Sequence, residues 1–266
     1  MSHALVTPPY NAVTKRAGGN IGFFGRFPAT PSGAVGARAL TYWVRDPRYS
    51  ASLVVIPFIA VLLFFSGGDG AFPFLGPITA FLLAWSISAD ISYDNTAFSL
   101  HLSTGVGGRA DRVGRAAALL VFSVPVTLLL TVVPLIILDR MEDLPVLLGL
   151  SLGLLFTGAG LSSVVSARYT YNVPLPGESA FKTPPGTSFL MFAVQFIGWL
   201  VMLLLALPEL VLTVVYFVTG DPLYGWLTLL VGLVLGTVLL VVGVRVGGRW
   251  YDRRAPALLQ AVSANR

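Results

Sequence analysis

The ionisable side chains that could do chemistry in this sequence are concentrated between residues 90 and 115. Asp90 and Asp94 directly follow a long apolar run, and three arginines then recur at three-residue spacing. Carboxylates beside an apolar run are costly unless they are hydrated or paired, so they are functional candidates by default. We expect them to form ion pairs with Arg109, Arg112 or Arg115, a role that can be purely structural.

Other chemistry is limited by what the sequence lacks. It contains no cysteine and only two histidines, His3 and His101, so we expect neither thiol chemistry nor a histidine metal site. Only Lys15 and Lys182 could anchor a phosphate-binding loop, and neither lies in the required glycine-rich motif. No catalytic constellation is visible. We therefore expect a chain that is not an enzyme and that binds no cofactor itself.

The elements that must position these residues are long runs without Asp, Glu, Lys or Arg, at 50–66, 72–89, 116–138, 144–165, 188–207 and 223–244. A helix of about 20 residues crosses a hydrocarbon core about 30 Å thick. The last four runs reach that length, and the first two are shorter and suit a tight hairpin. With 55% hydrophobic and 11% charged residues, the sequence predicts an all-α membrane protein with six transmembrane helices.

The basic residues lie between the runs and favour one side of the membrane. All of the 17 Lys and Arg residues except Arg140 fall in the N-terminal segment, in 90–115, in 166–187 or in the C-terminal segment. Cytoplasmic loops retain Lys and Arg, so both termini should be cytoplasmic. We expect an integral membrane protein. The net charge of +5 is then a sign of topology and not of nucleic-acid binding, because the basic residues form no aromatic-interleaved patch.

Two segments precede the first run. Residues 1–32 are rich in proline and glycine without a sustained period, which predicts a flexible cytoplasmic arm. Residues 33–46 predict a short helix, ended by Pro47, that lies in the membrane interface on anionic lipid. Its two faces carry Arg38, Tyr42 and Arg45 against Gly36, Leu40, Trp43 and Val44. The alternative is an ordinary juxtamembrane stretch whose arginines set topology.

The segment between the second and third runs has the pattern of a docking element. It predicts a short helix, capped by Asn95 or Thr96, with three apolar residues at alternate positions: Phe98, Leu100 and Leu102. Glycines at 105, 107 and 108 then allow a sharp reversal. A short helix between flexible turns can dock into a groove on another protein. The alternative is a solvated hairpin whose arginines only set topology.

The second half of the sequence contains a break and two glycine pairs. Pro208 and Glu209 interrupt the apolar stretch after the fifth run, and 210–218 is too short to cross a membrane, so it should be re-entrant, interfacial or a broken extension of the fifth span. Glu209 at this break could line a path for substrate or mark the water boundary, and we expect it to mark the boundary. Small-x-x-x-small spacing predicts close helix packing at Gly149, Gly153, Gly232 and Gly236.

A family resemblance begins at 37–48, where ARALTYWVRDPR is similar to the start of the transmembrane permease subunits of bacterial type-2 ABC exporters. The order of elements also resembles that family: an interfacial helix, six spans, a docking helix after the second span and a broken outer segment before the sixth. The resemblance implies a permease domain at 33–250 with a re-entrant segment at 210–218, followed by a cytoplasmic tail at 251–266. The arm looks like an interdomain linker, so the chain can be one half of a longer two-repeat permease.

The resemblance also implies a coupling helix near 93–104 that touches a separate ATPase, which would bind ATP and Mg²⁺. The contact residues it implies, with the arginines that follow, are Tyr93, Asp94, Thr96, Phe98, Leu100, Leu102, Arg109, Arg112 and Arg115. The three apolar residues among them would dock in the ATPase, and Arg109 and Arg112 would fix the register. Other implied partners are a second permease copy or half and membrane lipids, with no nucleic acid.

The main alternative is a secondary transporter or channel that works without ATP. Such proteins place ionisable groups near mid-membrane, whereas the runs contain only Gln195 and scattered Ser and Thr. An intramembrane enzyme, the third class, would need converging His, Asp or Glu at depth. The sequence therefore favours the exporter subunit, and its apolar spans suit lipids, hydrophobic drugs or a lipid-linked glycan equally.

Overall fold

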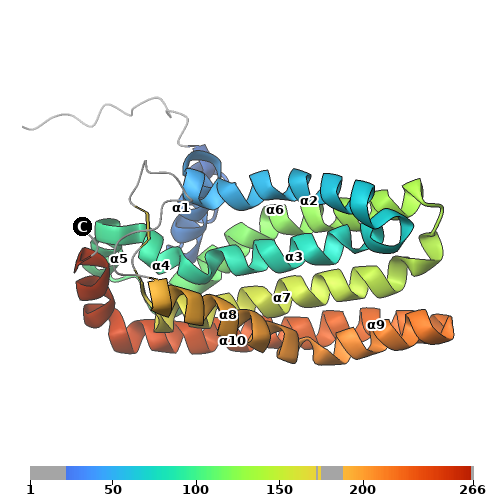
Figure 1. Cartoon of the computed structure of the whole chain (residues 1–266). Helices are drawn as coiled ribbons and strands as arrows, with labels where there is room; N and C mark the ends of the chain where they lie inside the picture. The colour runs from blue at the N-terminus through green and yellow to red at the C-terminus, as the bar shows by residue number, and fades with distance from the viewer. Residues whose placement is uncertain (1–21, 172, 175–187, 265–266) are drawn as a thin grey trace, which may run out of the picture.

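The computed structural model describes residues 22–171, 173–174 and 188–264, and every regular element in this part of the chain is helical. Most of the predicted arm and of the loop 166–187 lie outside the described residues. Long helices form a bundle (Figure 1): α2 (Pro47–Ala71), α3 (Leu75–Trp85), α6 (Gly108–Ile137), α7 (Leu144–Arg168), α8 (Ser188–Leu205), α9 (Leu207–Thr219) and α10 (Pro222–Ala264). The short helices α4 (Asp90–Asp94) and α5 (Phe98–Ser103) lie at the end of the bundle where the chain terminates, and α1 (Pro31–Arg45) lies near that end.

The composition of the long helices suits a membrane. Five described helical segments are long and apolar enough to cross a bilayer, and a sixth crossing results if α8 and α9 count as one bent span. Each of the six predicted runs overlaps one of these segments, so the prediction of an all-helical chain with up to six helices able to span a membrane is confirmed. α2 and α8 expose large apolar side chains, among them Phe58, Phe65, Phe192 and Leu204, as expected of surfaces that contact lipid.

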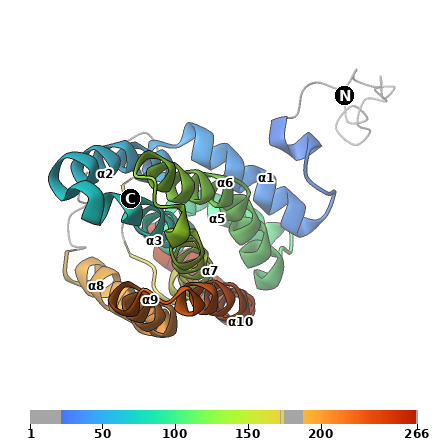
Figure 2. The same ribbon diagram turned by 90° about the vertical axis from the view of Figure 1, so that its right-hand side faces the viewer.

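α7 is the central helix, enclosed by α3, α6 and α10 (Figure 2). Its contact with α10 depends on the four glycines that the sequence analysis selected. A Cβ on Gly149 would lie 2.5 Å from the Cα of Leu229, and a Cβ on Gly153 would lie 3.0 Å from the Cα of Gly232. A Cβ on Gly236 would lie 3.2 Å from the carbonyl oxygen of Gly153. Without side chains at these positions, the two backbones touch.

The chain breaks between α8 and α9. The two helices are bent by 62°, Pro208 stands in the first turn of α9, where proline is tolerated, and Gly220 ends the helix with a φ of 69°. Figure 1 shows α9 continuing along the bundle beyond α8. Residues 210–218 thus belong to the second helix of a bent pair, the geometry of a broken span or a re-entrant segment. The prediction that Glu209 marks the water boundary is wrong. Its exposed fraction is 0%, because α9 starts inside the bundle against α7 and α10.

α10 does not end at residue 250, where the sequence analysis placed the domain boundary. Tyr251, Leu258 and Val262 are buried on Ile91 and Phe98. Their spacing of seven and four residues continues the apolar face of a helix. The prediction of a separate tail at 251–266 did not take this spacing into account. Residues 251–264 are therefore part of the packed structure.

α1 packs on α6, and the Thr30 side chain caps it by accepting a hydrogen bond from the Gly33 N–H at 3.1 Å. Leu40 and Trp43 are buried in this contact. Val44, which the sequence analysis placed on the same face, is 69% exposed.

Candidate functional site

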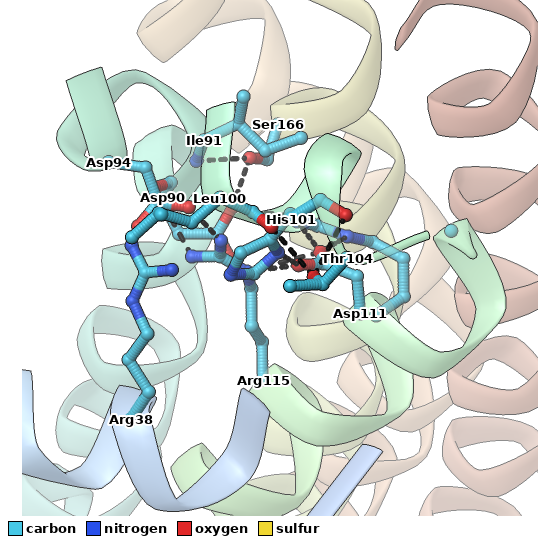
Figure 3. A network of polar contacts seen from close by, with 12 residues as sticks. Arg38, Asp90, Ile91, Asp94, Leu100, His101, Thr104, Asp111, Arg115 and Ser166 are labelled. Atoms are coloured by element: carbon cyan, nitrogen blue, oxygen red, sulfur yellow. Dashed lines mark hydrogen bonds and ion pairs between the residues drawn. The ribbon is translucent and has the colours of Figure 1, made fainter. Parts of the chain in front are cut away.

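A cluster of charged side chains lies inside the protein, where α4 and α5 meet the first turns of α6 (Figure 3). It combines three carboxylates with three guanidinium groups, so its formal charges balance. We call the following residues the ion cluster: Arg38, Asp90, Asp94, Asp111, Arg112 and Arg115. The Arg38 side chain is 19% exposed, and the other five side chains are exposed by 5% or less.

The start of α6 places half of this cluster. Gly105 has a φ of 68° and allows the reversal after α5, and Gly107 is extended. Asp252 of α10 then accepts a hydrogen bond from the Gly108 N–H at 2.6 Å, a favourable position for an acidic group at a helix N-terminus. Asp111 and Arg115, four residues apart, consequently share one face of the first turns.

Arg112 joins two carboxylates. Its Nη1 donates to Asp90 Oδ1 at 3.0 Å, and its Nε donates to Asp111 Oδ2 at 2.9 Å. The hydroxyl of Ser166, near the end of α7, also donates to Asp90 and accepts a hydrogen bond from the Ile91 N–H at 3.1 Å. The Asp90 carboxylate therefore ties α4 to α6 and α7.

Arg115 is the second centre of the cluster. Its Nε donates to Asp111 Oδ2 at 3.1 Å, and its Nη2 donates to Asp94. Arg38 of α1 donates from Nη2 to the other carboxylate oxygen of Asp94 at 3.1 Å. Asp94 thus connects α1 with α6, although the three residues belong to separate segments of the sequence.

The ion cluster is stable only while each buried charge keeps its partners. Burial of charges is costly, and their mutual attraction offsets that cost only where the partners are well placed, so removal of one partner costs about 3–5 kcal/mol. His101 Nδ1 lies 2.8 Å from Asp111 Oδ1, within ion-pair distance but without hydrogen-bond geometry. The arrangement is suited to holding helices in fixed positions. Among the described residues, no group of His, Asp and Glu is placed to hold a metal ion.

Polar contacts continue beside the cluster. Arg48 donates from Nη2 to the Tyr93 carbonyl at 3.1 Å and from Nη1 to the Pro174 carbonyl at 2.8 Å. The Tyr171 N–H donates to the Ser92 hydroxyl oxygen at 3.3 Å, and burial raises the pKa of the Tyr171 hydroxyl above its usual value. The described start of the loop after α7 is therefore held against α4.

The predicted coupling residues fall into two sets. Thr96, Leu100 and Arg109 are exposed, with Leu100 at 59%, and form what we call the α5 edge, together with Ser99, Ser103 and Thr104. The others are internal or half-buried: Tyr93, Asp94, Phe98, Leu102, Arg112 and Arg115. The Phe98 ring lies 5.4 Å from that of Tyr251 and is fully buried, so Phe98 packs α5 on α10 and does not belong to a docking surface. Arg112 likewise serves the ion cluster and cannot set a register with a partner.

Two local predictions about this segment have different outcomes. Neither Asn95 nor Thr96 caps α5, which begins after Ala97 without a side-chain cap, because Asn95 adopts a φ of 49° at the end of α4. The predicted pairing of the two acidic residues is found with Arg112 and Arg115, whereas Arg109 is exposed.

In the predicted interfacial helix, Tyr42 accepts a hydrogen bond from Arg38 Nε at 2.6 Å, and Arg45 is exposed. Arg38 was assigned to lipid, and no local signal indicates its partner 56 residues away. Asp111 and His101 were also missed as members of the site. The four-residue spacing of Asp111 and Arg115 is the one signal that could have indicated an intrahelical ion pair.

A separate apolar cavity, open to the outside of the bundle, lies among α2, α3, α7, α8 and α9. It has a volume of about 690 Å³, and its walls include the rings of Phe74, Phe81, Trp199 and Phe217. An apolar space of this size with aromatic walls suits a hydrophobic ligand.

Comparison of the chain with protein-family models, with curated proteins and with solved structures finds no match.

Proposed function

We propose that the chain is the transmembrane subunit of an ATP-driven exporter and couples to a separate ATPase through 90–115. The observation that carries the proposal is the α5 edge, an exposed surface mounted on a buried, charge-balanced ion cluster. The proposed location is the bacterial plasma membrane, with both termini and the α5 edge in the cytoplasm. The partner ATPase would bind ATP and Mg²⁺.

The contacts of α5 support a coupling role. On its inner side Phe98 packs on Tyr251 of α10, and the ion cluster holds the adjoining α4 to α6, α7 and α1. On its outer side Leu100 offers an apolar contact, and Arg109, in the first turn of α6, is also exposed and offers a charged one. A force applied to the edge would therefore reach several long helices at once. ATP can change access across the membrane only by binding one conformation better than the other, and such an edge provides a place for that difference in contacts.

The proposed substrate is hydrophobic, since the cavity among α2, α3, α7, α8 and α9 is apolar. A second copy or half of the permease would complete the transport path. The exposed apolar faces of α2 and α8 are available to that copy or to lipid.

The coupling can be tested by crosslinking, because the natural sequence has no cysteine. A Leu100→Cys variant, labelled with a benzophenone maleimide in membranes of the cells that make the protein, should form a photoadduct with an ATPase subunit that carries a phosphate-binding loop. The matched control is Phe58→Cys, which exposes a comparably apolar position on α2. The absence of an ATPase adduct at position 100, or an equal adduct at position 58, would overturn the proposal.

A second test changes the contact itself. Leu100→Asp should lower ATPase co-purification at least about tenfold, the effect of about 1.4 kcal/mol, whereas Leu100→Met should preserve it. Equal recovery with both variants would contradict a docking role for the α5 edge.

The burial of Glu209 favours a second candidate, a transporter driven by an ion gradient. Sequence reasoning argued against ion coupling because no ionisable group was expected at depth. Glu209 supplies one, inside the bundle at the start of α9. Transport that persists in liposomes without any ATPase, and that depends on an ion gradient, would support this candidate over the first.

A further inference from the structure

Glu209 is a buried acidic residue whose carboxyl group has no hydrogen-bond partner. Its exposed fraction is 0%. The neighbouring Thr213 hydroxyl donates to the backbone carbonyl of Glu209 at 2.7 Å, so it is not directed to the carboxyl group. The other buried acidic side chains of the described residues have arginine partners: Asp90, Asp94 and Asp111 in the ion cluster, and Asp143 in Arg140.

The carboxyl group lies deep within the bundle. A Cβ on Gly153 would lie 2.9 Å from Glu209 Oε1, so the carboxyl group occupies the space that this glycine leaves. Gly153 follows Leu144, the first residue of α7, by nine positions, which is about 14 Å along a helix. That is near half the thickness of a hydrocarbon core of about 30 Å. Figure 1 agrees, because the junction of α8 and α9 lies part-way along the bundle and not at an end.

No charged group faces Glu209 from the helices that pack on α9. α8 has no ionisable residue, and the one on α7, Arg168, is 15 positions from Gly153, or about 22 Å. On α10, Tyr224 and Arg245 lie eight and 13 positions from Gly232, or about 12 and 20 Å. On α9 itself, the Tyr216 hydroxyl is occupied by Asp143 Oδ1 at 2.8 Å.

These surroundings determine the state of the carboxyl group. An ionised carboxylate without a donor or cation is very costly in a medium of low dielectric, whereas the neutral acid is tolerated. The conformation described here therefore favours the protonated form of Glu209. Thr157 stands one turn from Gly153 on the same face of α7, and its hydroxyl oxygen is also buried without a partner. The same helix face thus carries a second polar group toward the end of the bundle that holds the ion cluster.

We propose that Glu209 is an intramembrane proton-binding site that takes up and releases a proton as the α8–α9 bend opens and closes. Release needs water or a cation at the carboxylate, and the bend after Ala206 is the place where the helix pair can admit it. The inference requires neither an ATPase nor an identified substrate, so its tests are independent of the exporter proposal. It deepens the second candidate function, which rests on the same residue.

The first test uses dicyclohexylcarbodiimide, an apolar reagent that reacts with protonated carboxyl groups. The acid O–H adds across one N=C bond of the reagent, and the O-acylisourea rearranges to an N-acylurea without loss of any atom. The intact chain in lipid vesicles should gain this adduct at Glu209, as found by peptide mass spectrometry. The yield should fall at least about tenfold from about pH 5 to about pH 9, a range that includes known buried glutamic acids.

The matched control is Glu142, an exposed residue in the helical turn Met141–Asp143 that precedes α7. Its carboxyl group should remain unlabelled in the same samples. The Glu209→Gln variant should lose the adduct and keep the fold, because the amide has nearly the same shape. Sodium at constant pH should not protect Glu209. Protection by sodium would overturn the assignment of the site to a proton.

Infrared difference spectroscopy of the natural chain against Glu209→Gln provides the second measurement. A carboxylic-acid C=O band that is present at about pH 5 and lost by about pH 9 supports the proposal even if the reagent does not reach the site. A band or an adduct of equal size at both pH values would show a permanently neutral, structural glutamic acid. That result, or the absence of both band and adduct, would overturn the proposal.

Discussion

Arg38 of α1 and Asp94 of α4 form an ion pair, with Nη2 and Oδ1 3.1 Å apart, across 56 residues of the sequence. Asp94 also accepts from Arg115 of α6. The Asp94 carboxylate therefore connects α1, which precedes α2, to α4 and α6. Through this ion pair and its packing on α6, one side of α1 lies against the protein interior.

The pair between Arg38 and Asp94 should be measurable by a double-mutant cycle. We expect Arg38→Ala and Asp94→Asn to show a coupling of about 1 kcal/mol, since contacting residues couple by about 0.5–3 kcal/mol and Arg38 is partly exposed. Denaturant unfolding in detergent micelles measures it. A cycle of Asp94→Asn with exposed Arg45→Ala is the control and should be additive.

Loss of Arg112 should strongly destabilise the protein. Arg112→Ala leaves Asp90 and Asp111 buried with fewer partners, and we expect a loss of about 3–5 kcal/mol in the free energy of unfolding. The matched comparison is Arg109, an exposed arginine three residues earlier. Arg109→Ala should change the free energy of unfolding by about 0.5 kcal/mol or less. Equal effects of the two changes would contradict the structural role of the ion cluster.

The contact between α7 and α10 should not tolerate a side chain at Gly149. A Cβ there would lie 2.5 Å from the Cα of Leu229, so Gly149→Ala must separate two backbones and should cost about 1–3 kcal/mol. Thermal unfolding in lipid nanodiscs measures the change. Gly70→Ala, where a Cβ meets nothing within 4 Å, should leave the midpoint unchanged or raise it.

The proposed orientation can be checked with single cysteines in the cysteine-free chain. A membrane-impermeant maleimide should label Asp221→Cys, between α9 and α10, in intact cells. The same reagent should label Ser99→Cys on the α5 edge only after lysis, because the loops with most Lys and Arg stay in the cytoplasm. The opposite pattern would reverse the orientation.

The helices could be predicted because each one carries its own signal. A run such as 116–138 has the length and composition of a span, and α6 contains all but its last residue. The glycines at 149, 153, 232 and 236 were recognised by their spacing, and the structure places them in one contact. The acidic pair at 90 and 94 was recognised because it follows an apolar run.

Which side chains are buried and which are exposed could not be predicted in this way, because burial depends on segments distant in the sequence. Phe98 and Leu100 look alike in a local pattern, but Phe98 meets Tyr251 of α10 and Leu100 meets solvent. Glu209 follows a proline at the end of an apolar run, which is typical of a water boundary. Its burial results from α9 packing on α7 and α10, a tertiary contact without a local signature.

The straight part of α10 has a mechanical consequence. From Pro222 to Asp252 it is one continuous helix of 31 residues, about 46 Å long. At one end Asp252 accepts a hydrogen bond from the start of α6, and at the other end α10 is connected to α9 through Gly220 and Asp221. A stiff rod of that length, tilted by about 10° about its midpoint, swings each tip by about 4 Å in opposite directions. Motion at one end of α10 would thus appear at the other end in the opposite direction and with the same amplitude.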